Sequence, residues 1–268
     1  MFDLSYELIL YGLAVGVVAG SLAGTLAGLA GVGGGLIYVP IFYLTIPGNQ
    51  ENLSIHIMAS LIAVALTGFF SARAHWRLGH LNRPAFKLLL PGLMIGAAIG
   101  LWSTLKIPEA IILFSLAMLD AWIAWDYGRD QTIKRDMPPT LLSGPIGYIS
   151  GALGIGGGTM LVPLLRRSLT LREAIGTSAA CGMAMALAAV LVNLLLEPMW
   201  IEQIYYEPAP FLIGALVGIA IIIPQTSGWS ARLHAMLPEQ LMQQILKGVF
   251  MVLSASLFVA GLLSIQSV

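Results

Sequence analysis

The residues best suited to bind a ligand are glycines in two nearly identical segments. Residues 24–40, GTLAGLAGVGGGLIYVP, return 123 positions later as residues 147–163, GYISGALGIGGGTMLVP. The apolar stretch that ends each segment is typical of a new helix, and the first N–H groups of a helix have no acceptor within it. Those N–H groups and the positive end of the helix dipole favour a bound anion. The pattern therefore predicts an anion site built largely from backbone.

Hydroxyl side chains follow each glycine-rich segment at matching places. Ser60 corresponds to Ser178, 118 positions later, and Thr177 lies beside it, so that these side chains could donate hydrogen bonds to the same anion. Glycine allows positive φ values and a close approach of the backbone to a ligand. The expected substrate-binding residues are Gly31, Gly33, Gly34, Gly35, Gly154, Gly156, Gly157, Gly158, Thr159, Ser60, Thr177 and Ser178.

Other glycines have a simpler interpretation. Small residues spaced by four positions let membrane helices pack closely. We assign that role to Gly16, Gly20, Gly24 and Gly28, and to Gly92, Gly96 and Gly100. Close packing is also the alternative for the two glycine-rich segments, although three consecutive glycines, occurring twice, exceed what packing needs.

Isolated polar residues within the apolar stretches also have alternatives. Serine and threonine hydroxyls in helices often bond to a carbonyl one turn back. We expect this for Thr25 and Thr67, and a comparable structural role for Asn193; it is also the alternative for Ser60, Thr177 and Ser178. Ionisable groups inside a membrane are functional candidates by default. However, His56 and Asp120 lie near enough to a predicted interface to be merely solvated.

The sequence contains none of the patterns that enzymes or cofactor sites require. Neither glycine-rich segment is followed by Lys-Ser or Lys-Thr, as a phosphate-binding loop would be. The histidines and the single Cys181 have no spacing typical of a metal site. Paired aspartates or a Ser–His pair for chemistry within the bilayer are also missing. We therefore predict no catalytic activity, no metal and no cofactor.

Composition places the chain in a lipid bilayer. Hydrophobic residues make up 58% of the sequence and charged residues 10%, with a mean hydropathy of +0.88. A soluble domain would carry about 25% charged residues. The net charge of zero and the lack of a long basic block argue against nucleic acid as a partner.

Ten apolar segments follow from the hydrophobic pattern. They cover about 7–30, 36–46, 54–75, 84–104, 108–125, 138–153, 159–168, 172–196, 208–227 and 238–264. At 1.5 Å per residue, segments 36–46 and 159–168 reach about 15 Å, half the thickness of a bilayer core. Each comes directly after a glycine-rich segment, so we expect a broken or re-entrant helix in each half.

Basic residues in short loops indicate orientation, because cytoplasmic loops are enriched in Lys and Arg. Such residues cluster in loops 73–87, 126–138 and 165–172, whereas loops 47–53 and 197–207 contain only acidic ones. These loops alternate correctly only if each broken helix pair returns to the side where it began. We therefore predict an all-α, polytopic transmembrane helical bundle of two inverted-topology repeats, residues 1–130 and 131–268, in the cytoplasmic (inner) membrane with both termini outside.

The doubled signature resembles the TauE/SafE sulfite exporter family over nearly the whole chain. It reads A-G-x-x-G-x-G-G-G-x-x-x-V-P in the first copy, with Ser150 in place of the alanine in the second, and the copies end at Val39-Pro40 and Val162-Pro163. The resemblance implies transport of sulfite, sulfoacetate or related sulfur-containing anions. The chain departs from the family at Ala59-Ser60, where Thr-Ser is common, so the two halves of the site need not bind alike.

We expect a secondary transporter that works by alternating access around a site near the membrane midplane. An anion channel of the same fold is the alternative, because both need the same site and differ in gating. A purely structural scaffold would not need duplicated helix breaks. The sequence leaves open the identity of the anion, import or export, coupling to a proton or another ion, and the oligomeric state, a dimer included.

Overall fold

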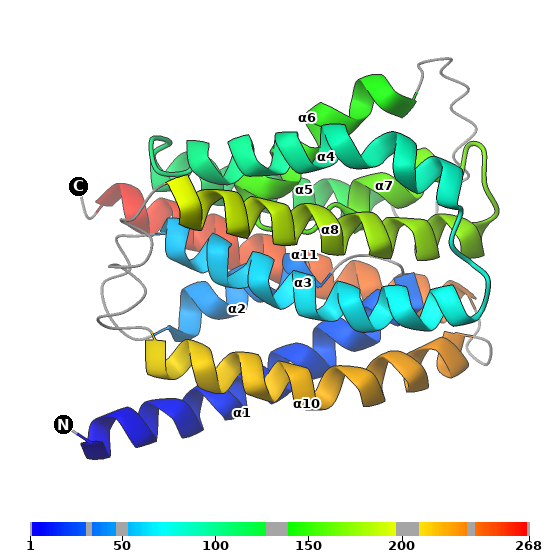
Figure 1. Cartoon of the computed structure of the whole chain (residues 1–268). Coiled ribbons are helices and arrows are strands. Elements are labelled where there is room, and N and C mark those ends of the chain that lie inside the picture. The colour runs from blue at the N-terminus through cyan, green and yellow to red at the C-terminus, as the bar shows by residue number, and fades with distance from the viewer. Residues whose placement is uncertain are drawn as a thin grey trace.

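The computed structural model describes residues 2–30, 34–46, 53–126, 139–196, 209–234 and 239–266, and its regular secondary structure in these ranges is entirely helical. The helices are α1 (Phe2–Ala30), α2 (Gly35–Thr45), α3 (Leu53–Arg77), α4 (Arg83–Ser103), α5 (Glu109–Asp126), α6 (Pro139–Leu153), α7 (Gly158–Leu165), α8 (Leu171–Leu196), α10 (Ala209–His234) and α11 (Glu239–Gln266). Most of them run roughly along one direction (Figure 1). The predicted all-α class is confirmed, and each predicted segment coincides with one helix.

Five of these helices are long and apolar enough to cross a membrane. The spans are Tyr6–Ala27, Leu53–Arg77, Arg83–Ser103, Arg172–Leu196 and Ala209–Thr226. By contrast, α2 has 11 residues and α7 has 8. At 1.5 Å per residue they reach only about 16 Å and 12 Å, far short of a bilayer core of about 30 Å. The chain is therefore a multi-pass membrane protein that contains two short helices.

Side chains determine where two of the long helices begin. The amide oxygen of Asn82 accepts a hydrogen bond from Ala85 N at 3.1 Å, and Pro84 occupies the first turn of α4. Before α8, Thr170 and Glu173 form a reciprocal capping box, in which Thr170 N donates to the Glu173 carboxylate and Glu173 N donates to Thr170 Oγ1. Both helix starts are therefore encoded locally.

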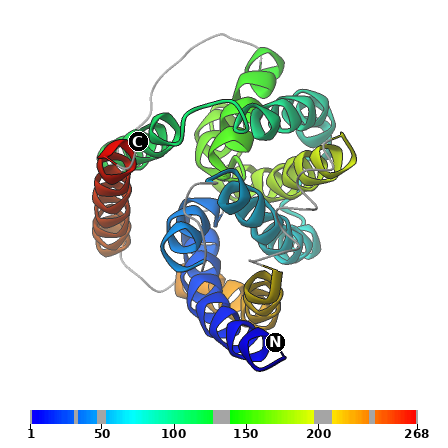
Figure 2. The ribbon, with the colours of Figure 1, turned by 90° about the vertical axis from the view of Figure 1, so that its left-hand side faces the viewer.

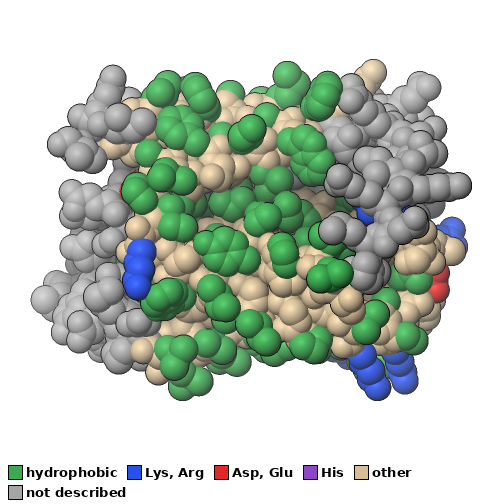
Figure 3. Space-filling model, turned by 90° about the horizontal axis from the view of Figure 1, so that it is seen from above, with side chains coloured by type: hydrophobic (Ala, Val, Ile, Leu, Met, Phe, Trp, Pro, Cys, Tyr) green, Lys and Arg blue, Asp and Glu red, His purple; other side chains and the backbone are tan. Residues whose placement is uncertain are grey.

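The surface of the bundle is apolar across its middle. In the face seen in Figure 3, hydrophobic side chains cover the centre, and Lys and Arg lie towards the two ends. Large exposed apolar residues include Val18 on α1, Ile95 and Ile99 on α4, and Ile213 and Val217 on α10. An exposed apolar band of this kind suits contact with lipid rather than with water.

Glycines bring two pairs of helices into close contact, which confirms the packing role predicted for Gly16, Gly20, Gly24, Gly92, Gly96 and Gly100; the surroundings of Gly28 are outside what the structure describes. A side chain at Gly16 would clash with the backbone of Ala215, which joins α1 to α10. A side chain at Gly96 would clash with the backbone of Gly144 and Tyr148, which joins α4 to α6. Without a Cβ the helices approach closely and gain dispersion contacts that substitute for a hydrophobic driving force.

The packing partners of the first five helices correspond to those of the last five. If α1–α5 are exchanged with α6, α7, α8, α10 and α11 in order, the α1–α10 contact becomes the α6–α4 contact, and the α3–α10 contact becomes the α8–α4 contact. The α3–α8 and α5–α11 contacts map onto themselves. Helix α1 begins and helix α11 ends at the same end of the molecule (Figures 1 and 2), while the side of the membrane that this end faces stays a prediction.

Candidate functional site

The two helix breaks meet in the interior of the bundle. A side chain at Gly35, the first residue of α2, would clash with the carbonyl group of Gly154 and the backbone of Ile155, both in the break between α6 and α7. The same Gly154 carbonyl accepts a hydrogen bond from Ser60 Oγ on α3 at 2.8 Å. The two glycine-rich segments are therefore in direct backbone contact, although more than 100 residues separate them in the sequence.

Left-handed glycines turn the chain between α6 and α7. Gly154, Gly156 and Gly157 have φ values of 68°, 70° and 70°. Residues with a Cβ rarely adopt this conformation, which costs them about 1–2 kcal/mol. Gly34, at the start of α2, has φ of −57° instead. The described parts of the two breaks thus differ in backbone conformation despite their similar sequences.

The short helices begin without side-chain caps. Gly157 precedes α7 and Gly34 precedes α2, and neither offers a side chain to the first N–H groups. The Gly157 carbonyl accepts hydrogen bonds from Met160 N and Leu161 N. Thr159 N precedes these two donors in the chain and does not bond to this carbonyl. The hydroxyl of Thr159 is also buried and has no hydrogen-bond partner among the described residues. Helix α7 therefore presents donors that suit an anion.

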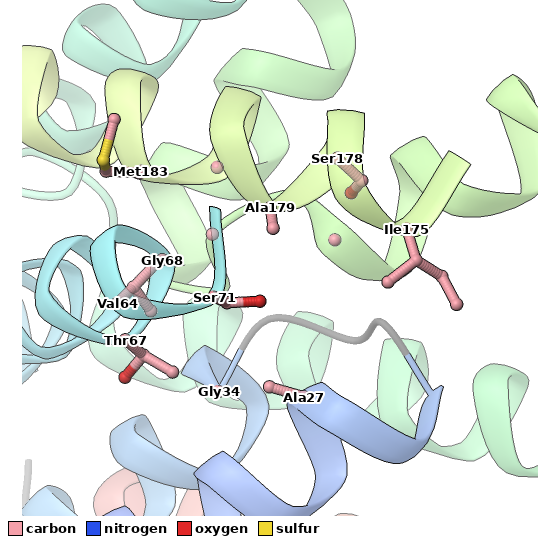
Figure 4. Close-up of a pocket in the computed structure, with 13 residues that line it drawn as sticks. Ala27, Gly34, Val64, Thr67, Gly68, Ser71, Ile175, Ser178, Ala179 and Met183 are labelled. Carbon is pink, nitrogen blue, oxygen red and sulfur yellow. The ribbon is translucent and has the colours of Figure 1, made fainter. Parts of the chain in front are cut away.

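A small cavity lies between these breaks, the second half of α3 and the first half of α8 (Figure 4). Its lining consists of Ala27, Gly34, Val64, Thr67, Gly68, Ser71, Gly156, Gly158, Ile175, Ser178, Ala179, Gly182 and Met183. Its volume is about 20 Å³. One water needs about 10–15 Å³ measured in this way, so the cavity has room for about one.

The polar groups of the cavity are hydroxyls and backbone, without any ionisable side chain in the lining. Ser178 Oγ is buried and has no hydrogen-bond partner among the residues that the structure describes. Thr67 Oγ1 donates to Ala63 O at 2.8 Å and lies 2.7 Å from the hydroxyl of Tyr38 on α2. Ser178 is therefore one side chain of the cavity that is available to a ligand, and the hydroxyl of Ser71 on α3 is a second lining donor.

The predicted site residues fall into groups. Gly34, Gly156, Gly158 and Ser178 line the cavity; Gly35, Gly154 and Ser60 join the two breaks; Gly157 and Thr159 lie buried at the start of α7; and Gly31 and Gly33 are outside the described residues. Thr177 is elsewhere, because its hydroxyl accepts a hydrogen bond from Asn82 N at 2.9 Å in the loop between α3 and α4. Its interaction in this structure is with that loop.

The predictions about three isolated polar residues, Thr25, Thr67 and Asn193, were correct. Thr25 Oγ1 donates to Ser21 O, and Thr67 Oγ1 donates to Ala63 O, in each case one turn back. The side chain of Asn193 donates to Ala98 O at 3.0 Å and so links α8 to α4. These contacts are structural in the conformation described.

The prediction that His56 and Asp120 are merely solvated is wrong. Only 3% of His56 is exposed, and its ring lies 5.5 Å from the ring of Tyr43. Asp120 has no exposed surface at all. Position along a helix gives depth, but it does not give the face of the helix, and both side chains point towards protein rather than towards an interface.

Several lining residues escaped the sequence reasoning because they are apolar or small. Gly68 on α3 approaches Met183 on α8, and Gly182 on α8 approaches the carbonyl group of Gly156. An isolated glycine inside an apolar helix costs about 1 kcal/mol relative to alanine and often has a packing or functional reason. That signal was present at both glycines and could have identified them.

Comparisons with known proteins give one consistent result. The sequence matches the family model "Sulfite exporter TauE/SafE" over residues 16–257. A probable membrane transporter protein of Haemophilus influenzae is 32% identical over 174 residues, which are 60% of this chain and 66% of the relative. A probable membrane transporter protein of Methanocaldococcus jannaschii is 26% identical over 168 residues, 59% of this chain and 60% of the relative. The chain thus spans a little under two thirds of the length of these curated relatives, and no solved structure matches it.

Proposed function

The chain belongs to the TauE/SafE sulfite exporter family, and on that premise we propose that it moves a small sulfur-containing anion through the cavity between its two helix breaks. It is a membrane transporter and not an enzyme. Sulfite and organosulfonates such as sulfoacetate are the substrates that we propose. The unpartnered hydroxyl of Ser178, in a cavity that also borders the start of α7, is the observation that carries the proposal.

The chemistry of the cavity suits an oxyanion. A buried hydroxyl and helix N-terminal N–H groups are neutral donors, and none of the lining side chains is acidic. An unpaired buried donor costs about 1–3 kcal/mol, so the site stabilises any ligand that satisfies it. A sulfonate or sulfite group has three oxygens that can accept from donors on different elements, here Ser178 on α8 and Gly158 on α7.

We also propose that the two halves are inverted repeats. The matching packing partners support this, and so does a second sequence match that lies outside the glycine-rich segments. Residues 107–111, IPEAI, correspond to residues 237–241, LPEQL, 130 positions later, at the starts of α5 and α11. A side chain at Gly147 would clash with the backbone of Leu93. One at Gly24, 123 positions before Gly147, would lie nearest to Thr226 and in ordinary contact, at 3.8 Å, with the side chain of Ile223, which is 130 positions after Leu93. One pseudo-two-fold axis would relate both contacts.

The size of the cavity supports transport by alternating access. With room for about one water, it must widen before an anion of several atoms can enter. The cavity lies in the half of the bundle that is near the loop between α3 and α4. Arg73, Arg77 and Arg83 flank this loop in the sequence. These cations would attract an anion to this end, which we assign to the cytoplasm.

A channel of the same fold remains the second candidate. A contracted cavity favours a carrier, which exposes its site to one side at a time, over a pore that stays open. The rate of anion flux into proteoliposomes distinguishes the two. For a carrier we expect the rate of flux to saturate as the anion concentration rises. A rate that rises in proportion to the concentration, together with single-channel currents, would support the channel instead.

The binding proposal is tested by thermal unfolding of the purified protein with sulfite, sulfate, thiosulfate, sulfoacetate, taurine or chloride. A ligand raises stability according to its affinity for the folded state. We expect one sulfur anion to stabilise the wild type and to lose about tenfold or more in affinity with Ser178→Ala, since a hydrogen bond to a charged group contributes about 1.5–3 kcal/mol.

The matched control is Ser21→Ala, which removes a hydroxyl that bonds to Val17 O within α1, away from the cavity. This variant should bind the anion as the wild type does. Equal stabilisation of the wild type and Ser178→Ala by the same anion would remove Ser178 from the site. Stabilisation by none of the sulfur anions would contradict the proposed substrate class.

A further inference from the structure

Asp120 is an acidic residue that the anion site does not use. It lies on α5, and its side chain has no exposed surface. Neither carboxyl oxygen has a hydrogen-bond partner among the described residues. It is six residues, or about 9 Å, before the last residue of the helix. An unpartnered charge at such a place is very costly, and ionisable groups in membrane proteins are retained there for function.

The elements packed against α5 leave the carboxyl group without a counter-charge. Helix α11 lies beside α5 at one edge of the bundle (Figure 2) and is joined to it by a hydrogen bond of 2.9 Å from Ser254 Oγ to Ala117 O. From α11, Lys247 lines a cavity together with Ala121 and Ala124 of α5, but it forms no hydrogen bond with the carboxyl group. Helix α6, which also packs against α5, contains no acidic or basic residue, and α2 approaches α5 through Tyr43 at Glu109, at the start of the helix and away from Asp120.

We propose that Asp120 is a proton-coupling site, which takes up one proton and releases it once in each transport cycle. The inference rests on the proposed anion transport. A proton is the ligand that fits, because it needs only the carboxyl group itself. A metal cation would need several oxygen ligands, and no further polar atom lies within hydrogen-bonding distance of this carboxyl group in the described part of the chain.

Electrostatics sets the direction of coupling. A carboxylate and a bound anion carry like charges in a medium of low dielectric constant, so each disfavours the other. Protonation of Asp120 removes this repulsion, and by linkage a bound anion equally favours protonation. For a singly charged anion, the loaded carrier, with a neutral acid and the anion, then has the same charge as the empty carrier with a carboxylate; doubly charged sulfoacetate adds one negative charge to the loaded form. Proton and anion therefore move in the same direction.

The repeat supplies the stoichiometry. The register that joins Glu109 to Glu239, the first residues of α5 and α11, places Phe250 at the position of Asp120. Phe250 is fully buried as well. The second half thus has an apolar ring where the first has the carboxyl group, which gives one proton for each anion.

Infrared spectroscopy tests proton binding without reference to transport. We expect the difference between spectra of wild type and Asp120→Asn in lipid to contain the C=O band of a protonated carboxyl group at low pH, and this band to disappear as pH rises. Addition of sulfoacetate should move that disappearance to higher pH. A difference spectrum without an acid band, or with a band that does not change across the pH range that the membrane tolerates, overturns the proposal.

Flux in proteoliposomes tests coupling, with sulfoacetate as the probe and the membrane potential held at zero. With one proton per anion, a pH difference of one unit should drive about tenfold accumulation in the wild type. Asp120→Asn should lose the accumulation while exchange of internal for external sulfoacetate continues. Ser254→Ala, which disturbs the same helix pair but keeps the carboxyl group, should accumulate as the wild type does.

The outcomes separate this proposal from the transport function. Undiminished pH-driven accumulation by Asp120→Asn would overturn the coupling role. A wild type that moves no sulfoacetate, but whose Asp120 titrates in the infrared, would instead contradict the proposed substrate and leave proton binding in place. Asp120→Asn protein that elutes and unfolds as the wild type does will establish that lost accumulation is not lost folding.

Discussion

Replacement of Gly35 by alanine tests the contact between the two helix breaks. Gly35 is the first residue of α2, and a Cβ there would clash with three backbone atoms of Gly154 and Ile155. Backbone cannot move aside as the end of a flexible side chain can, so we expect a cost near the upper end of the usual range for overpacking, about 3 kcal/mol. Alanine is also the better helix former, by about 1 kcal/mol.

Gly248→Ala is the matched control, because Gly248 lies in α11 and a Cβ there would meet no atom within 4 Å. Gly248→Ala gains about 1 kcal/mol of helix propensity, which Gly35→Ala, at the first residue of its helix, does not gain in full, and the contact itself contributes about 3 kcal/mol to the difference between their stabilities. For chains of this size 1 kcal/mol corresponds to about 2–4 °C in Tm, which gives a difference of about 6–12 °C.

The assay is thermal unfolding of both variants and the wild type in the same detergent, followed by anion flux in proteoliposomes. We expect Gly248→Ala to unfold at or slightly above the temperature of the wild type and to retain flux. Gly35→Ala should unfold well below it and lose flux. If Gly35→Ala is as stable as Gly248→Ala, the two breaks are not in backbone contact, and the site described above is not formed in this way.

Three further substitutions probe hydrogen bonds near the cavity. Ser60→Ala removes the donor to Gly154 O, and since the carbonyl stays buried we expect a loss of about 1–3 kcal/mol in unfolding experiments; unchanged stability would contradict this bond. Tyr38→Phe removes the hydroxyl beside Thr67 and should cost about 0.5–1.5 kcal/mol by the same measurement, with a gain in stability as the contrary result. Thr177→Val removes the acceptor of Asn82 N, so hydrogen exchange at that amide should accelerate about fivefold or more while amides in the middle of α8 stay protected; equal protection of Asn82 in both proteins would show that the loop is held by other contacts.

Helix positions were largely predictable because they depend on local signals. Apolar runs, the asparagine before α4, the proline in its first turn and the Thr170–Glu173 capping box are all visible in the sequence, and the predicted segments coincide with the helices. The two glycine-rich breaks were equally visible, since glycine is the residue that allows φ near 70° at Gly156 and Gly157.

Side-chain partners were less predictable, because they depend on which helices become neighbours. Thr177 and Ser178 are adjacent in the sequence, but successive residues of a helix point about 100° apart. One therefore bonds to the loop at Asn82, while the other lines the cavity. The same reason explains why Asp120, expected at a solvated interface, is fully buried.

The sequence by itself determined that this chain lies in a membrane, where its helices begin and end, and that two similar breaks interrupt them. Composition, hydrophobic length and glycine conformation are local properties, and each can be evaluated without knowledge of the fold. Only the tertiary structure decided that the breaks touch at Gly35 and Gly154, and that Ser178 has no partner among the described residues. These features arise between segments that are far apart in the chain, where the packing of whole helices selects which donors are paired and which remain available to an anion.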